Sequence, residues 1–323
     1  MLSSEWIREE ALGVGFGACG IARCYPLVEQ REFFARWLGE GLHDGLAYLE
    51  RNIETRFDPA RLVSGARTVI VCLVSYNHEA WRSTCAAEIA GRETNDTYEF
   101  PKIASYALAQ DYHITIREML ERLLGIIRER YPNCSGRSFT DTAPLSEKAW
   151  AAEAGLGWIG KHSLLISPQY GSFVLLGEVV IDIEADHYDE PAVHDGCGEC
   201  RRCLDACPNG AITAPRTLDL RRCISHLSIE RPAATFSEHR AVPAEPDALH
   251  GWIFGCDICQ AVCPHNNCAP RYTNPAFAPR FNPAAISREQ WLAMPPDAFE
   301  KRFGKTPVAR RGLASIRTQL AKR

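Results

Sequence analysis

The feature that most constrains this chain is a dense group of cysteines in its second half. Residues 191–270 contain nine of the fourteen cysteines, together with many turn residues and little apolar sequence. A segment of this composition cannot bury enough apolar surface to be stabilised by a hydrophobic core alone. We therefore expect this part of the chain to fold around an inorganic core that the cysteines bind.

The spacing of the first cysteines indicates which inorganic core this is. In CGECRRCLDACP, two residues separate Cys197 from Cys200 and Cys200 from Cys203, and Cys207 follows directly before a proline. This is the bacterial ferredoxin run for a [4Fe–4S] cluster. A chain that loops around a cubane reaches three iron corners with such steps, whereas the fourth cysteine points towards a second cluster.

A second run, GCDICQAVCPHN, supplies Cys256, Cys259 and Cys263, again ending in Cys-Pro, and the isolated Cys223 completes a set of eight. Structural zinc is the alternative, but zinc requires neither a third cysteine at this spacing nor paired Cys-Pro endings. Cys268 has no partner in this scheme. With the usual crossover, the first cluster takes Cys197, Cys200, Cys203 and Cys263, and the second takes Cys207, Cys223, Cys256 and Cys259.

The other cysteines and the hydropathy pattern bear on the compartment. No stretch reaches about 18 uninterrupted apolar residues, so we expect no membrane-spanning helix. The polar, acidic start argues against a signal peptide. We therefore expect thiols and metal ligands rather than disulfides, and a cytoplasmic protein. The scattered Cys19, Cys24, Cys72, Cys85 and Cys134 are expected to be small buried hydrophobes.

Charge is distributed unevenly along the chain. The formal net charge is −4, yet residues 301–323 contain eight Lys and Arg and no Asp or Glu. Such a basic segment can contact phosphate, and it can equally be a solvated helix end.

Alternating helices and strands fit an α/β or α+β fold for residues 1–190, and we expect the α+β class. Residues 66–76 and 172–186 are apolar and β-branched, as in buried strands, and residues 111–131 have the spacing of an amphipathic helix. We also expect a helix over 4–16 and a strand over 17–24. The predicted organisation is thus a mixed α/β domain (1–190), a ferredoxin-like domain with two [4Fe–4S] clusters (191–270) and a short helical C-terminal tail (271–323).

Two further motifs are ambiguous from the residues alone. In DTAPLSEKAWAAEAGLGWIGKH, Asp141 or Thr142 is expected to cap a helix. The glycines follow a helix rather than a strand, which argues against a dinucleotide fingerprint. A glycine-rich turn can also let the backbone approach a large flat cofactor. The DYH motif begins like the cobalamin pattern DxHxxG, but Ile116 replaces its glycine. We therefore expect His113 to pack against the core and not to bind cobalt.

The chain as a whole resembles the epoxyqueuosine reductases, cobalamin and iron–sulfur enzymes of tRNA queuosine biosynthesis that are related to reductive dehalogenases. The resemblance extends from the N-terminus to about residue 312. It is carried by GFGACGIAR, ETRFDPARLVSGARTVI, DYH, DTAPLSEKAWAAEAGLGWIGKHSLLI, GSFVLLGE, CGECRRCLDACPNGAI, RRCISHLSIE and GCDICQAVCPHN.

The resemblance implies that the N-terminal domain binds base-off cobalamin, with no histidine on cobalt. Asp141 would lie above the cobalt as proton donor, with a pKa raised by burial. His162 stands where the family commonly has Asn, and Arg231 falls where a basic residue contacts tRNA. The residues expected to line the corrin are Arg56, Ala104, His162, Leu165 and Leu176.

The implied reaction converts epoxyqueuosine to queuosine at the tRNA wobble position, with electrons from an external donor passing through the clusters to cobalt. We expect a monomer. Family members often continue into a helical-repeat domain that binds tRNA, whereas this chain ends soon after the start of that region. Two alternatives are another corrinoid iron–sulfur reductase, such as a reductive dehalogenase, although the twin-arginine export signal common in those enzymes is not visible, and an electron-transfer ferredoxin protein without corrin.

Overall fold

A four-stranded antiparallel sheet forms the centre of the N-terminal region. The computed structural model describes residues 1–78, 99–191, 195–231, 248–272 and 274–321. The strands predicted over 17–24, 66–76 and 172–186 are all present, and every neighbouring pair is antiparallel. The spatial order is β1 (Ala18–Arg23), β2 (Thr68–Ser75), β7 (Val174–Ile181), β4 (Gly136–Phe139).

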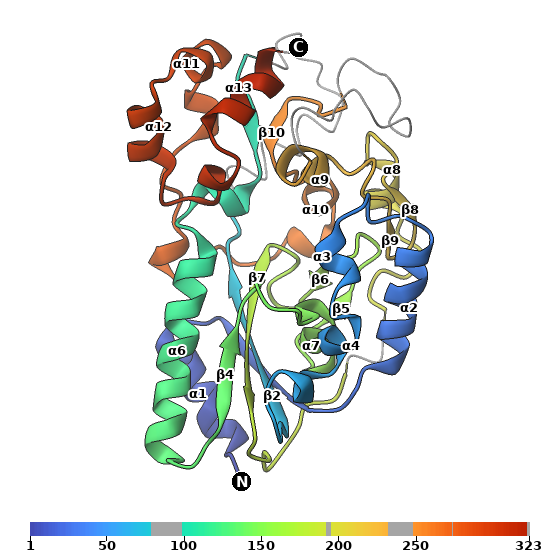
Figure 1. Cartoon of the computed structure of the whole chain (residues 1–323), viewed down its shortest axis with the longest axis vertical. Coiled ribbons are helices and arrows are strands. Elements are labelled where there is room, and N and C mark those ends of the chain that lie inside the picture. The colour runs from blue at the N-terminus through green and yellow to red at the C-terminus, as the bar shows by residue number, and fades with distance from the viewer. Residues whose placement is uncertain (79–98, 192–194, 232–247, 273, 322–323) are drawn as a thin grey trace.

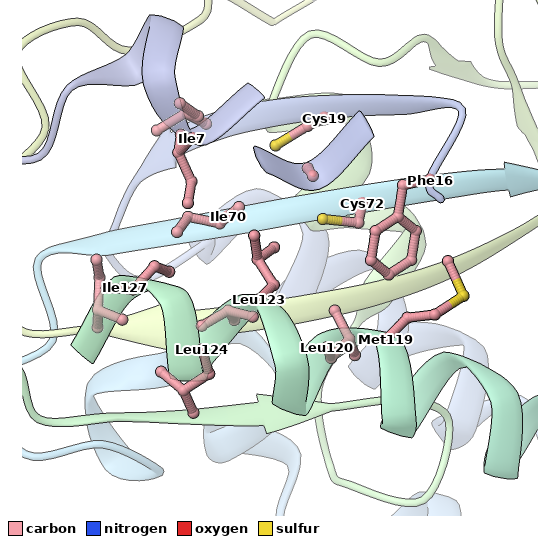
Figure 2. Packing of buried hydrophobic residues seen from close by; sticks show 14 of the residues in the cluster. Ile7, Phe16, Cys19, Ile70, Cys72, Met119, Leu120, Leu123, Leu124 and Ile127 are labelled. Atoms are coloured by element: carbon pink, nitrogen blue, oxygen red, sulfur yellow. The ribbon is translucent and has the colours of Figure 1, made fainter. Parts of the chain in front are cut away.

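One face of the sheet is covered by α1 (Ser4–Val14) and α6 (Tyr112–Arg130) (Figure 1). The side chain of Ser3 caps α1 by accepting a hydrogen bond from the backbone of Trp6. The predicted apolar stripe of α6 packs into the core of this face, where its leucines meet isoleucines of α1 and β2 (Figure 2). Burial of this stripe stabilises the helix on the sheet.

Close contact between α6 and the sheet depends on Gly177 in β7. A Cβ atom at this position would lie 2.6 Å from Cγ2 of Ile116 and 2.8 Å from Cδ1 of Leu120. Any side chain here would push α6 away from the sheet.

The opposite face of the sheet carries shorter helices. The fully buried Trp150 packs there with Phe57 and Val71. The helices on this side of the sheet are α2 (Val28–Gly39), α3 (Ala47–Glu50), α4 (Ile53–Phe57) and α7 (Glu147–Glu153).

The cysteine-rich region folds into short elements beside α2. Trp37 in α2 donates a hydrogen bond from Nε1 to the carbonyl of Leu218, 2.7 Å away, which fastens the two regions together. A small apolar cluster around Leu227 and Trp252 supports this region. Its elements are α8 (Arg202–Asp205), β8 (Ile212–Ala214), β9 (Thr217–Leu218), α9 (Ile224–Ile229), β10 (Trp252–Phe254) and α10 (Ile258–Ala261).

The C-terminal helices α11 (Arg288–Ala293), α12 (Pro296–Phe303) and α13 (Leu313–Ala321) pack against β10 and the short strand β3 (Lys102–Ile103), which pair in parallel. This core therefore joins residues from all three predicted regions, and the region boundaries stay a prediction. The α+β fold class is confirmed. None of the helices that the structure describes combines the length and apolarity needed to span a membrane.

Candidate active site

A cavity of about 440 Å³ lies where the sheet meets the cysteine-rich region. One wall comes from the start of β7 and from β6 (Leu165–Ile166), which pairs with β5 (Trp158–Ile159). The predicted residues His162, Leu165 and Leu176 line this wall. Four tyrosines from separate segments complete the mostly apolar lining, namely Tyr48, Tyr76, Tyr106 and Tyr112.

The structure places the other predicted corrin residues outside this lining. Ala104 is 1% exposed, and its Cβ occupies the space that a side chain at Gly255 would need. Arg56 donates from a guanidinium nitrogen to the carbonyl of Tyr48 at 2.7 Å, so it supports the backbone of a residue that lines the cavity. Burial lowers the pKa of Arg56 from its ordinary value.

The eight cysteines of the two runs lie in two groups. The larger cavity is lined by Cys207, Cys223, Cys256 and Cys259, and a small separate cavity of about 20 Å³ is lined by Cys197, Cys200, Cys203 and Cys263. This is the division that the crossover pattern predicts, although which sulfur binds which iron stays a prediction. Cys268 is exposed, and Cys85 lies outside the described residues.

Over the part of the chain that the structure describes, no three His, Cys, Asp or Glu side chains form a group that could hold a single metal ion. Burial raises the pKa of the Cys256 and Cys259 thiols well above the ordinary value, so without a bound metal these sulfurs are thiols rather than thiolates.

Residues outside the cysteine runs hold the two cysteine groups in place. Lys161 donates from Nζ to the carbonyls of Gly198 at 2.6 Å and Cys200 at 3.0 Å, which fixes the loop of the first group. At the second group, the buried Gln260 contacts Tyr76 and accepts a hydrogen bond from Ser172 at 3.2 Å. These contacts tie both sulfur groups to the N-terminal region.

His162 lines both cavities and is 4% exposed. Its Nδ1 accepts a hydrogen bond from the backbone of Leu164 at 3.2 Å, and burial lowers its pKa to about 4. The neutral ring therefore carries its proton on Nε2, an atom that is buried without a hydrogen-bond partner among the described residues. A cofactor carbonyl or sulfur could accept this proton donor.

Asp141 is not among the lining residues but contacts Tyr112, which is, and it lies in a loop rather than at a helix cap. The helix after it begins at Glu147, so the expectation that Asp141 or Thr142 caps this helix was wrong. Asp141 has a φ of 48°, a left-handed conformation uncommon for aspartate. Its backbone N–H donates to Oε1 of Glu147, which holds the loop in this conformation.

The Asp141 carboxylate accepts two hydrogen bonds at Oδ2, from the hydroxyl of Tyr112 at 2.7 Å and from Nε2 of His113 at 3.0 Å. These contacts, chiefly that with His113, hold the pKa of Asp141 below its ordinary value. The expected raised pKa was therefore wrong for the structure, because hydrogen bonding to the charged form outweighs burial.

His113 is a second residue that the sequence analysis placed incorrectly. It was expected to pack against the core, but its Nδ1 lies 2.7 Å from Oδ1 of Asp111 while its Nε2 faces Asp141. The two carboxylates, Asp111 first, raise the pKa of His113 to about 9. At neutral pH a proton is thus held on His113 between two ionised aspartates. In the sequence, the DYH motif, 28 residues before Asp141, is the signal that could have indicated this contact between His113 and Asp141.

Arg231 is buried, with 5% of its surface exposed, and its Nε lies 3.8 Å from Oδ2 of Asp44. In this conformation its guanidinium is not presented at the surface, where a phosphate would meet it. Arg310 from the basic C-terminal segment pairs with Glu230 at 2.8 Å, next to the cavity lining.

Two family models match this chain. A model described as the 4Fe-4S double cluster binding domain covers residues 196–266. A second, described as epoxyqueuosine reductase QueG, DUF1730, covers residues 56–142.

Curated relatives match nearly the whole chain. An epoxyqueuosine reductase of Cellulophaga algicola is 35% identical over 318 residues, covering 98% of this chain and 96% of the relative. The epoxyqueuosine reductase of Escherichia coli is 36% identical over 278 residues, covering 86% of this chain and 69% of the relative.

Solved structures resemble the fold closely. A crystal structure of an epoxyqueuosine reductase with an epoxyqueuosine-modified tRNA-Tyr stem loop aligns with a TM-score of 0.82 at 27% identity, covering 98% of this chain and 80% of that one. The Bacillus subtilis enzyme, with its catalytic aspartate loop swung out of the active site, aligns with a TM-score of 0.81 at 26% identity and the same coverage.

Proposed function

The chain belongs to the epoxyqueuosine reductase family, and we propose that its 440 Å³ cavity is where epoxyqueuosine is reduced. This oxidoreductase converts epoxyqueuosine to queuosine, a reaction that consumes two electrons and two protons and releases the epoxide oxygen as water. The observation that carries the assignment is that one cavity is bordered by four cysteines and by Tyr112, which holds Asp141.

The residues around the cavity fit cobalamin. An apolar wall that includes Leu165 and Leu176 suits the face of a flat corrin, and the unpartnered Nε2–H of His162 can donate to one of its amide carbonyls. Bound cobalamin would supply a reducible cobalt ion for the reduction of the epoxide.

The four cysteines of the larger cavity would hold the cluster nearer to the substrate, and those of the small cavity the more distant one. The 4Fe-4S double cluster domain provides both clusters. Electrons from an external one-electron donor would therefore enter at the group containing Cys197 and leave at the group containing Cys259.

Asp141 is the proposed proton donor to the departing epoxide oxygen. Because hydrogen bonds hold Asp141 ionised, the proton it delivers would come from His113, whose pKa is about 9. The solved relative from Bacillus subtilis, whose catalytic aspartate loop is swung out of its active site, supports movement of such a loop.

The substrate is proposed to be tRNA that carries epoxyqueuosine, as in the solved relative with its modified stem loop. The basic residues of 301–323 would contact phosphates near the cavity, and Arg231 would do so only after it leaves Asp44. Cytoplasmic location suits a chain whose described cysteines form no disulfide, and a monomer remains the proposed state.

The test is mass analysis of nucleosides after the protein, reconstituted with iron, sulfide and cobalamin, is incubated with epoxyqueuosine-containing tRNA and a reductant. Wild type should form queuosine. Asp141→Asn should form none while it retains the corrin and iron–sulfur absorption bands. Full activity of Asp141→Asn would refute its role, and absence of corrin bands from the wild type would refute the cobalamin site.

A further inference from the structure

A carboxyl group without a partner lies in the middle of the sheet. Glu178 in β7 is opposite Val71 of β2 and Phe139 of β4, and it faces α7 together with Leu176 and Val180. None of its surface is exposed, and neither oxygen of its carboxyl group has a hydrogen-bond partner among the described residues. A structural role for the strand would be filled better by an apolar side chain of similar size.

Glu178 is expected to be neutral in the folded protein. An ionised carboxylate buried without a partner is far too costly, so the group keeps its proton instead. Burial, with the nearby carboxylates of Glu147 and Asp141, raises the pKa of Glu178 well above its ordinary value. Cys72 of β2 is the other titratable group that interacts with it.

Glu178 lies close to the loop that contains Asp141, because it pairs with Phe139 at the end of β4. Leu176, the preceding residue on the same face of β7, lines the cavity, and the carbonyl of Leu176 accepts a hydrogen bond from Thr140 at 3.4 Å. Asp141 follows in the chain, and its backbone N–H donates to Glu147 at the start of α7. Glu178 is thus covered by the elements that position the proposed proton donor.

Glu147 is a second carboxyl group with a raised pKa beside Asp141. Burial and the charge of Asp141 raise the pKa of Glu147 to about 8, so it too is largely protonated at neutral pH. The charged groups that face Glu147 are Asp141, Lys148 and His113. His113 and Asp141 carry one proton between them, whereas the reaction needs two.

We propose that Glu178 and Glu147 form a proton store behind Asp141 that supplies the second proton of the reaction. This inference rests on the proposed function and deepens it. The first C–O bond breaks as the oxygen takes the proton held by His113 and Asp141. The second C–O bond breaks as the resulting hydroxyl takes the stored proton and leaves as water. An external one-electron donor supplies the two electrons, and solvent later reprotonates the store.

The first test is infrared spectroscopy of the purified protein, which needs no turnover. At neutral pH the wild type should show the C=O stretch of a protonated carboxylic acid, and Glu178→Gln should lose that band. Glu129→Gln, at the exposed far end of α6, is the matched control and should keep it. A wild-type spectrum without a Glu178-dependent band would overturn the proposal.

The second test is the single-turnover rate of queuosine formation against pH. Glu178→Gln should be slowed about tenfold or more at neutral pH, with a larger loss above the pKa of Glu147, while cluster and corrin absorption stay unchanged. If Glu178→Gln loses its clusters, Glu178→Met keeps the volume without a titratable group and takes its place. A wild-type rate and pH profile in these variants would overturn the store, whereas an inactive wild type with a normal infrared band would overturn the proposed function instead.

Discussion

Replacement of Asp111 by Asn tests whether His113 is the source of the first proton. Asp111 lies outside the cavity lining, and its Oδ1 contacts both the backbone N–H and the ring Nδ1 of His113. Asparagine is an equally good helix cap, so the start of α6 should be kept. What the substitution removes is the carboxylate whose hydrogen bond contributes most to the raised pKa of His113.

The size of the effect follows from the pKa of His113. The pKa is raised from 6.5 to about 9, so at about pH 8 nearly all His113 is protonated, against only a few per cent with an ordinary pKa. Asp111→Asn should therefore lower kcat/KM about tenfold near pH 8 and leave it almost unchanged near pH 6. The basic limb of the pH profile should move towards 6.5.

The same contact predicts how stability depends on pH. A raised histidine pKa stabilises the fold fully below the unfolded value of about 6.5, and the contribution is lost as pH rises through about 9. Partial exposure limits the effect, so Asp111→Asn should destabilise by about 1–2 kcal/mol at pH 6 and by much less at pH 10. Urea unfolding measures this, with the exposed Glu118→Gln as control. In the activity assay, a basic limb of the kcat/KM profile that Asp111→Asn leaves in place would refute the role of His113 as the source of the first proton.

Three other changes test separate parts of the structure. Cys207→Ser should lower the iron content from about eight to about four atoms per chain, which iron analysis measures, and unchanged iron would remove Cys207 from the ligand set. Gly177→Ala should destabilise the protein by about 1–3 kcal/mol in urea unfolding because α6 must move. Gly125→Ala is the control, because a Cβ there meets open space, and it should not destabilise the protein. Equal stabilities of the two variants would contradict the close packing of α6 on Gly177. His162→Phe should weaken cobalamin binding in absorption titrations and leave the iron content unchanged, and unaltered binding would exclude the Nε2–H contact.

The sequence predicted best what depends on local pattern. The strands of β2 and β7 and the helix α6 follow from apolar runs and from 3.6-residue spacing, and the two cysteine groups follow from their regular steps. A cubane requires a fixed spacing of its cysteine ligands along the chain, so those cysteines can be predicted without knowledge of the fold.

Contacts between segments far apart in the chain could not be predicted from the sequence. His113 and Asp141 are 28 residues apart, and nothing in either motif fixes their distance. The burial of Arg231 depends on Asp44, nearly 190 residues earlier in the chain. In the sequence, Glu178 is an ordinary polar residue of a strand. Its burial follows only from the sheet order, which places β7 inside the sheet with helices on both faces. A local pattern specifies elements, whereas pKa values depend on which elements meet.

The central claim is that residues of the two cavities hold two iron–sulfur clusters and cobalamin, which act with Asp141 to reduce epoxyqueuosine in tRNA. Nucleoside mass spectrometry of tRNA after a single turnover tests this most directly. The reconstituted wild type should convert epoxyqueuosine to queuosine, and Asp141→Asn, equally loaded with both cofactors, should not. Unconverted epoxyqueuosine with a fully loaded wild type and a competent reductant would contradict the account.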